Sequence, residues 1–109
     1  MTESYRNETV AIFAIQSIHK AEVRYQSQNG PFAPSLTDLL PFLTPPDLAR
    51  GLNQGYAFSL TVTATGYVIR ANPVAYGETG NRTFYSDETM VIRENYGPEP
   101  AIATSPPIR

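Results

Sequence analysis

The first 28 residues contain neither glycine nor proline, and Asn29, Gly30 and Pro31 follow directly after them. Because this combination terminates helices, we expect one helix over residues 3–28, roughly 40 Å long at 1.5 Å per residue. An apolar stripe recurs along it at helical spacing and is expected to face a core. The stripe consists of Ala11, Ala14, Ile15, Ile18, Ala21 and Tyr25.

The middle of this helix is apolar on more than one side. Val10 belongs to the same apolar run, and Ile12 and Phe13 point away from the stripe, Phe13 roughly opposite it. A helix that is apolar all round needs cover on every side, and one small domain covers only one. We therefore predict that Val10, Ile12 and Phe13 contact other molecules, or belong to a longer apolar helix. The alternative is a single exposed phenylalanine, which is common on protein surfaces.

Residues 30–54 hold five prolines and are expected to form a loop between the helix and the strands. Two short helical turns are predicted within it. The first covers residues 35–40, with Ser35 as its N-cap and Asp38 three residues later. The second covers residues 46–50, with Pro46 near its first position and Gly51 as its end.

The strands follow from a two-residue period. Apolar Tyr56, Phe58, Leu60 and Val62 alternate with smaller or polar residues, and residues 64–66 turn the chain into a return strand at 67–71. Residues 82–85 and 90–93 predict a second hairpin that turns at 87–89. The expected fold class is α+β: a long N-terminal helix packed on a four-stranded antiparallel sheet. We expect one domain over residues 1–109, with both hairpins within 55–95 and a Pro-rich tail at 97–109.

Composition narrows the classes of function. The 109 residues carry a net charge of −2 with 41% hydrophobic residues, so a charge-rich disordered chain is excluded. No basic cluster recommends nucleic acid as a partner. The absence of cysteine removes disulfides, thiolate nucleophiles and sulfur-ligated metal sites. The longest apolar run, residues 10–15, is far shorter than the roughly 20 residues that span a bilayer.

Two titratable residues on the helix are the main candidates for chemistry. His19 and Glu22 form a His-x-x-Glu pair that could supply two metal ligands, although two ligands make a weak site and a histidine on the rim of the helix is the alternative. Glu22 falls inside the apolar stripe, where an unpaired carboxylate is costly. Either it is a general acid with a raised pKa, or it binds loop backbone or an arginine such as Arg70 or Arg93.

Acidic residues gather at the predicted tip of the second hairpin. Asp87 and Glu88, with Glu78 in the preceding loop, could bind Ca²⁺ through oxygen ligands. Acidic hairpin tips also serve turn formation alone. No nucleophile, phosphate-binding or zinc-protease motif is present, so the sequence assigns no catalytic residue, no metal and no cofactor, and an enzyme is not expected.

Several stretches in a fixed order carry a resemblance to a known family. Residues 7–25 (NETVAIFAIQSIHKAEVRY) follow the cadence Glu-x-x-Ala-x-x-x-Ile-x-x-Ile-x-x-Ala-x-x-x-Tyr and run on to Gly30. Residues 34–39 (PSLTDL) follow, then the hairpin stretches 55–60, 66–67 and 82–93, and finally 105–108 (SPPI). Together they resemble the soluble head of the type IV pilin and type II secretion pseudopilin superfamily.

That resemblance implies a structural subunit of a filament, assembled through its N-terminal helix. The implied partners are identical or homologous subunits and a secretion or pilus assembly machinery. Members of the superfamily carry a basic leader, an N-methylated phenylalanine and about 20 apolar residues, and this sequence is expected to begin where that segment ends. Only that segment would touch the membrane, which places the native protein in the inner membrane with a periplasmic head, or in an extracellular filament. Pilus and pseudopilus both remain open, and a periplasmic or extracellular binding module without filament assembly is the alternative.

Overall fold

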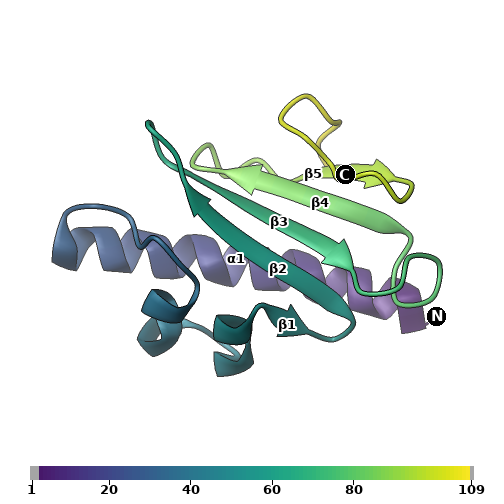
Figure 1. Ribbon diagram of the computed structural model, residues 1–109, viewed down its shortest axis with the longest axis horizontal. Coiled ribbons are helices and arrows are strands. Elements are labelled where there is room, and N and C mark those ends of the chain that lie inside the picture. Colours follow the sequence, from purple (N-terminus) through teal and green to yellow (C-terminus); the bar gives the residue numbers. More distant parts are fainter. Residues whose placement is uncertain (1–2, 109) are drawn as a thin grey trace.

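Helix α1 (Glu3–Asn29) lies along one face of an antiparallel sheet in the computed structural model, which describes residues 3–108 (Figure 1). The helix ends one residue later than predicted. Gly30 has a φ of 94° and donates its N–H to the carbonyl of Gln26 at 2.8 Å. A left-handed residue at this place caps the helix, and glycine adopts that conformation without a Cβ penalty.

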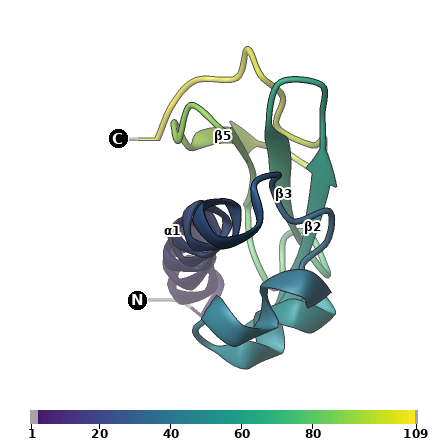
Figure 2. The same ribbon diagram turned by 90° about the vertical axis from the view of Figure 1, so that its left-hand side faces the viewer.

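The sheet is a meander in which each strand pairs with the next along the chain. Seen along the helix axis, α1 forms one layer and the sheet the other (Figure 2). The prediction of an α+β fold with one long N-terminal helix on an antiparallel sheet is therefore confirmed. The strands are β1 (Leu52–Asn53), β2 (Tyr56–Val62), β3 (Tyr67–Pro73), β4 (Arg82–Asp87) and β5 (Arg93–Tyr96).

The predicted number of strands is wrong, because the described chain has five and the sequence indicated four. The additional strand, β1, pairs Leu52 with Ala57 and Asn53 with Tyr56. Gln54 (φ 49°) and Gly55 (φ 79°) connect it to β2. Two successive positive φ angles are typical of a two-residue type I′ hairpin turn. A two-residue strand is too short to show an alternating pattern.

The return strand of the second hairpin is also misplaced in the prediction. It was expected at 90–93, whereas β5 covers Arg93–Tyr96 and pairs Tyr96 with Arg82. The Asp87 carboxylate accepts hydrogen bonds from the backbone and hydroxyl of Thr89, and Met90 has a φ of 67°. Because this turn leaves the extended conformation at Met90, residues 88–92 form a connection instead of a strand.

Residues 30–54 contain two 3₁₀-helices, η1 (Thr37–Phe42) and η2 (Pro46–Arg50). Ser35 does not cap η1 as predicted. Its hydroxyl donates to the Asp38 carboxylate at 2.8 Å, and Leu36 occupies the capping position without a side-chain bond. Gly51, with a φ of 79°, ends η2 as predicted.

The core lies between α1 and the inner face of the sheet. Its largest fully buried apolar side chains are Ile15, Ile18, Leu39, Leu48, Tyr56, Tyr67, Ile69 and Phe84. The Pro-rich tail packs along the outer edge of β5. The backbone N–H of Glu94 donates to the carbonyl of Pro106, and the backbone N–H of Ile108 donates to the carbonyl of Ile92, both at 2.9 Å. Within residues 3–108, no helix is both long and apolar enough to cross a membrane.

Candidate functional site

The three residues predicted to contact other molecules differ in their exposure. Phe13 is 62% exposed and projects away from the sheet side of α1. Val10 and Ile12 are only partly exposed, and Ile12 packs against the core, although it was expected to point away from the stripe. Ala11, Ile15 and other members of the stripe are buried against the sheet. Of the predicted interface residues, Phe13 therefore offers the largest free apolar surface.

Phe13 borders a groove of about 440 Å³ between α1 and the segment around η1. The guanidinium of Arg24 lies over the ring of Phe42, 5.1 Å from the ring centroid. This groove combines exposed aromatic surface with the positive charges of Lys20 and Arg24. It is lined by Phe13, Gln16, Ser17, Lys20, Arg24, Phe42 and Thr44.

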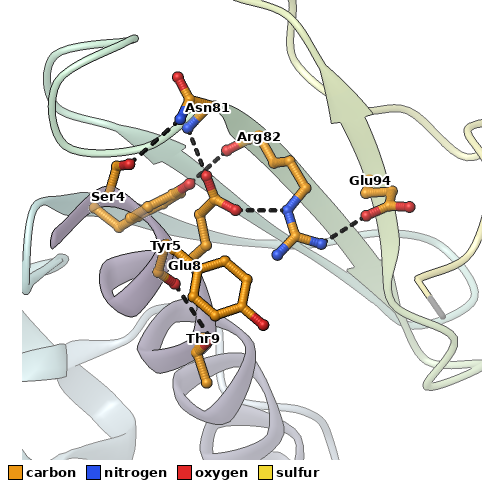
Figure 3. A network of polar contacts seen from close by, with 8 residues as sticks. Ser4, Tyr5, Glu8, Thr9, Asn81, Arg82 and Glu94 are labelled. Atoms are coloured by element: carbon orange, nitrogen blue, oxygen red, sulfur yellow. Dashed lines mark hydrogen bonds and ion pairs between the residues drawn. The ribbon is translucent and has the colours of Figure 1, made fainter. Parts of the chain in front are cut away.

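A buried ion network holds the N-terminal half of α1 to the sheet (Figure 3). Nε of Arg82 lies 2.8 Å from Oε1 of Glu8, and Nη1 of Arg82 lies 2.8 Å from Oε1 of Glu94. The other oxygen of Glu8 accepts the backbone N–H of Asn81 at 2.7 Å. Burial alone would lower the pKa of Arg82, but the hydrogen bonds to Glu94 and Glu8 outweigh it and raise that pKa.

This network was missed in the sequence, although Glu8 lies seven residues before Ile15 and therefore on the same helix face. The side chain of Arg82 is 12% exposed, that of Glu8 6% and that of Glu94 11%. Such buried pairs are costly to break because one partner's removal leaves the other charge uncompensated. The network therefore fixes the helix to β4 and β5.

His19 is buried under the sheet, so the expected position on the helix rim is wrong. Its Nδ1 lies 2.6 Å from the Tyr67 hydroxyl and its Nε2 2.7 Å from the Ser86 hydroxyl. Burial lowers the pKa of His19, partly opposed by the charge of Asp87. Burial and then the nearby charge of Glu22 raise the pKa of Tyr67 to about 12. His19 thus joins the helix to β3 and β4 through two hydroxyls.

His19 also touches a shallow groove of about 360 Å³ between α1 and Met90. Both of its ring nitrogens are already within hydrogen-bond distance of protein hydroxyls. Glu22 does not line this groove. The two candidate catalytic residues therefore do not converge on one pocket.

Glu22 is fully buried inside the apolar stripe. Its Oε1 accepts the backbone N–H of Ala33 at 2.7 Å, and Oε2 has no partner within the described residues. Burial raises the pKa of Glu22 to about 7, with a further contribution from Asp38, while the bond from Ala33 opposes the shift. Loop backbone is therefore the partner, and Arg70 and Arg93 make their contacts elsewhere.

The acidic residues proposed as calcium ligands already accept hydrogen bonds from the protein or lie far apart. Hydrogen bonds from Thr89 and Tyr85 keep the pKa of Asp87 below its usual value, although its partial burial acts in the opposite direction. Glu88 accepts the backbone N–H of Tyr67 at 3.2 Å. Glu78 precedes β4, at the end opposite to Asp87. Over residues 3–108, no group of three or more metal-binding side chains comes together.

Comparisons with known proteins add no relative. No protein-family model, no curated protein and no solved structure matches this chain. What bears on its function is therefore the arrangement of its own residues, above all the exposed side of α1.

Proposed function

We propose that this chain is the head of a pilin-like filament subunit, in a type II secretion pseudopilus or a type IV pilus, and that it assembles through α1. The observation that carries this proposal is the division of the helix surface. One stripe of α1 packs on the sheet, and the opposite side leaves Phe13 62% exposed. An exposed aromatic ring on a long helix is suited to packing against a neighbouring helix.

The shape of the molecule supports the same function. The 27-residue helix runs along the length of a molecule whose largest extent is 40 Å (Figure 1). Among residues 3–108, none forms a layer over its outer side (Figure 2). A subunit that packs its helix at the centre of a filament needs this arrangement, since the sheet must then face outward.

The polar contacts between helix and sheet support a mechanical role. Glu8 joins α1 to Arg82 on β4, and His19 joins it to Tyr67 on β3 and Ser86 on β4. These contacts lie at two places along the helix, so a load applied to α1 passes to the sheet at both. A filament that pushes or pulls requires such a rigid connection between the helix and the head.

Replacing Phe13 with glutamate tests the proposal. In cells that express the protein as encoded in its native gene, we expect Phe13→Glu to reduce assembled filament by at least about tenfold, because a charge would be buried between helices. Filament is measured by shearing cells and quantifying the released subunit. The free energy of unfolding is expected to change by less than about 0.5 kcal/mol, since the side chain is exposed.

Tyr76→Glu provides the matched control, because Tyr76 is a 45% exposed aromatic residue in the loop before β4. We expect it to leave assembly near the wild-type level. Normal filaments from Phe13→Glu would contradict assembly through this face of α1. No filament from the wild-type gene would remove the proposal itself and favour the binding module.

A further inference from the structure

Strand β2 has an open outer edge along its second half. On that side, β1 pairs only with Tyr56 and Ala57, and Phe58 then donates its N–H to the carbonyl of Gly51 at 2.7 Å. From Ser59 to Val62, β2 pairs with β3 alone among the described strands (Figure 2). Ser59, Thr61 and Val62 are exposed and Leu60 is half-buried.

The direction of the backbone groups at this edge follows from the strand period. The N–H of Phe58 points outward, toward Gly51, so those of Leu60 and Val62 do as well. Thr63 donates inward, to Gly66 on the β3 side, as the alternation requires. In the part of the chain that the structure describes, the N–H and C=O groups of Leu60 and Val62 have no hydrogen-bond partner.

The two edges of the sheet differ in whether another segment covers them. The tail covers β5, with Glu94 and Ile108 hydrogen-bonded to it across that edge. Exposed edges are usually guarded by lysine, proline or a bulge. Residues 59–66 (SLTVTATG) contain no charged residue and no proline. The open edge is therefore uncharged and can pair with another extended chain.

We propose that a second copy of this chain pairs with the open edge of β2, antiparallel and around a twofold axis through Thr61. This register places Leu60 opposite Val62 of the partner copy, and the reverse. Both residues direct their backbone groups outward, so each of the two facing pairs exchanges two hydrogen bonds. Ser59 then faces Thr63, and no like charges meet. The result is a continuous sheet across two molecules.

The contact is short and therefore weak in dilute solution. Because it involves only a few residues of each copy, we expect it to bury far less than the roughly 1,200 Å² typical of stable complexes, and the chain to be mainly monomeric at micromolar concentration. A twofold contact also closes on itself, whereas assembly along α1 would be polar and repeating. The edge contact would thus join two unassembled subunits or two separate filaments, and it stands independently of the proposed function.

A single introduced cysteine tests both the contact and its register, because residues 1–109 contain none. With Thr61→Cys, the two thiols meet at the twofold axis in a pair without hydrogen bonds, with Cα atoms about 4.5 Å apart, within the range of a disulfide. With Ser59→Cys, the two Cα atoms are about 14 Å apart in this register. We expect the Thr61→Cys dimer to form at least about tenfold faster under mild oxidation. Equal rates for the two variants would overturn the proposal.

Backbone amide chemical shifts provide a measurement without cysteine. In the wild-type chain, the amide signals of Leu60 and Val62 are expected to move as concentration rises to about a millimolar, because their N–H groups gain acceptors. Thr61→Lys places two like charges opposite one another at the axis and is expected to abolish the shift. Thr65→Lys, in the turn outside the pairing register, is the matched control and keeps it. Unchanged wild-type shifts up to that concentration would contradict the pairing.

Discussion

Replacing Arg82 with methionine is expected to lower the free energy of unfolding by about 3–5 kcal/mol, the range found when one partner is removed from a buried ion pair. The variant keeps the length of the side chain and removes its charge. Glu8 and Glu94, which each lie 2.8 Å from the guanidinium, would then face one another without a cation. The guanidinium also lies over the rings of Phe84 and Tyr96, so those contacts are lost as well.

Urea unfolding at pH 7 measures this loss, with Arg50→Met as the control. Arg50 pairs with Asp47 at 3.8 Å, but both side chains are more than 70% exposed. Exposed pairs contribute little, so Arg50→Met should change stability by less than about 0.5 kcal/mol. If Arg82→Met lowered the free energy of unfolding by less than about 1 kcal/mol, water and not the guanidinium would be the main hydrogen-bond partner of the two carboxylates.

The main elements of the fold could be predicted because their patterns are local. Tyr56 and Phe58 on β2, and Tyr67 and Ile69 on β3, alternate with more exposed neighbours and are buried. The end of α1 follows from the conformational freedom of Gly30. In each case a few neighbouring residues determine the structure, so one sequence is sufficient to identify it.

The remaining features depend on side-chain contacts that the hydrophobic pattern does not encode. Val91 and Ile92 are β-branched and indicate a strand, yet the turn held by Asp87 leaves them in a connection. Likewise, Glu8 and Arg82 are 74 positions apart, and their pairing follows from how α1 lies over β4. The exposure of Phe13 was predictable from the helix period, whereas the partial burial of Ile12 was not.

Glu8 and Glu22 lie seven residues on either side of Ile15 and share its helix face. They are about 21 Å apart along the helix axis. Each holds a different part of the chain: Glu8 binds β4 through Arg82, and Glu22 binds the loop after the helix through Ala33. Glu8 has a cation at 2.8 Å, but Glu22 has only a backbone N–H. Of these two buried carboxylates, Glu22 is therefore the one without a neighbouring cation.

Glu22 is expected to make the protein less stable as the pH rises. Burial raises its pKa from 4.5 to about 7 in the folded chain. Between these two values the unfolded chain loses the proton and the folded chain keeps it, so the stability contributed by the neutral form declines. The decline begins above about pH 4.5, is complete above about pH 7, and amounts to about 3 kcal/mol.

Comparing Glu22→Gln with the wild type isolates this effect. His19 acts in the opposite direction, because its lowered pKa costs stability as the pH falls below 6.5, but it is present in both proteins. Glutamine keeps an acceptor for the Ala33 N–H and has no proton to lose. Relative to the wild type, we expect the variant to gain about 3 kcal/mol of stability between pH 4 and pH 8.

Urea unfolding at intervals of one pH unit measures that difference, and Glu78→Gln, the same change at an exposed position in the loop before β4, is the control. A constant difference between Glu22→Gln and the wild type would show that the pKa of Glu22 is the same in the folded and the unfolded chain. Its carboxylate would then have to gain a partner for Oε2 by movement of the loop around Ala33. The gain predicted here requires instead that the loop stay closed over Glu22, with Ala33 bonded to Oε1 and Oε2 without a partner, as in the structure.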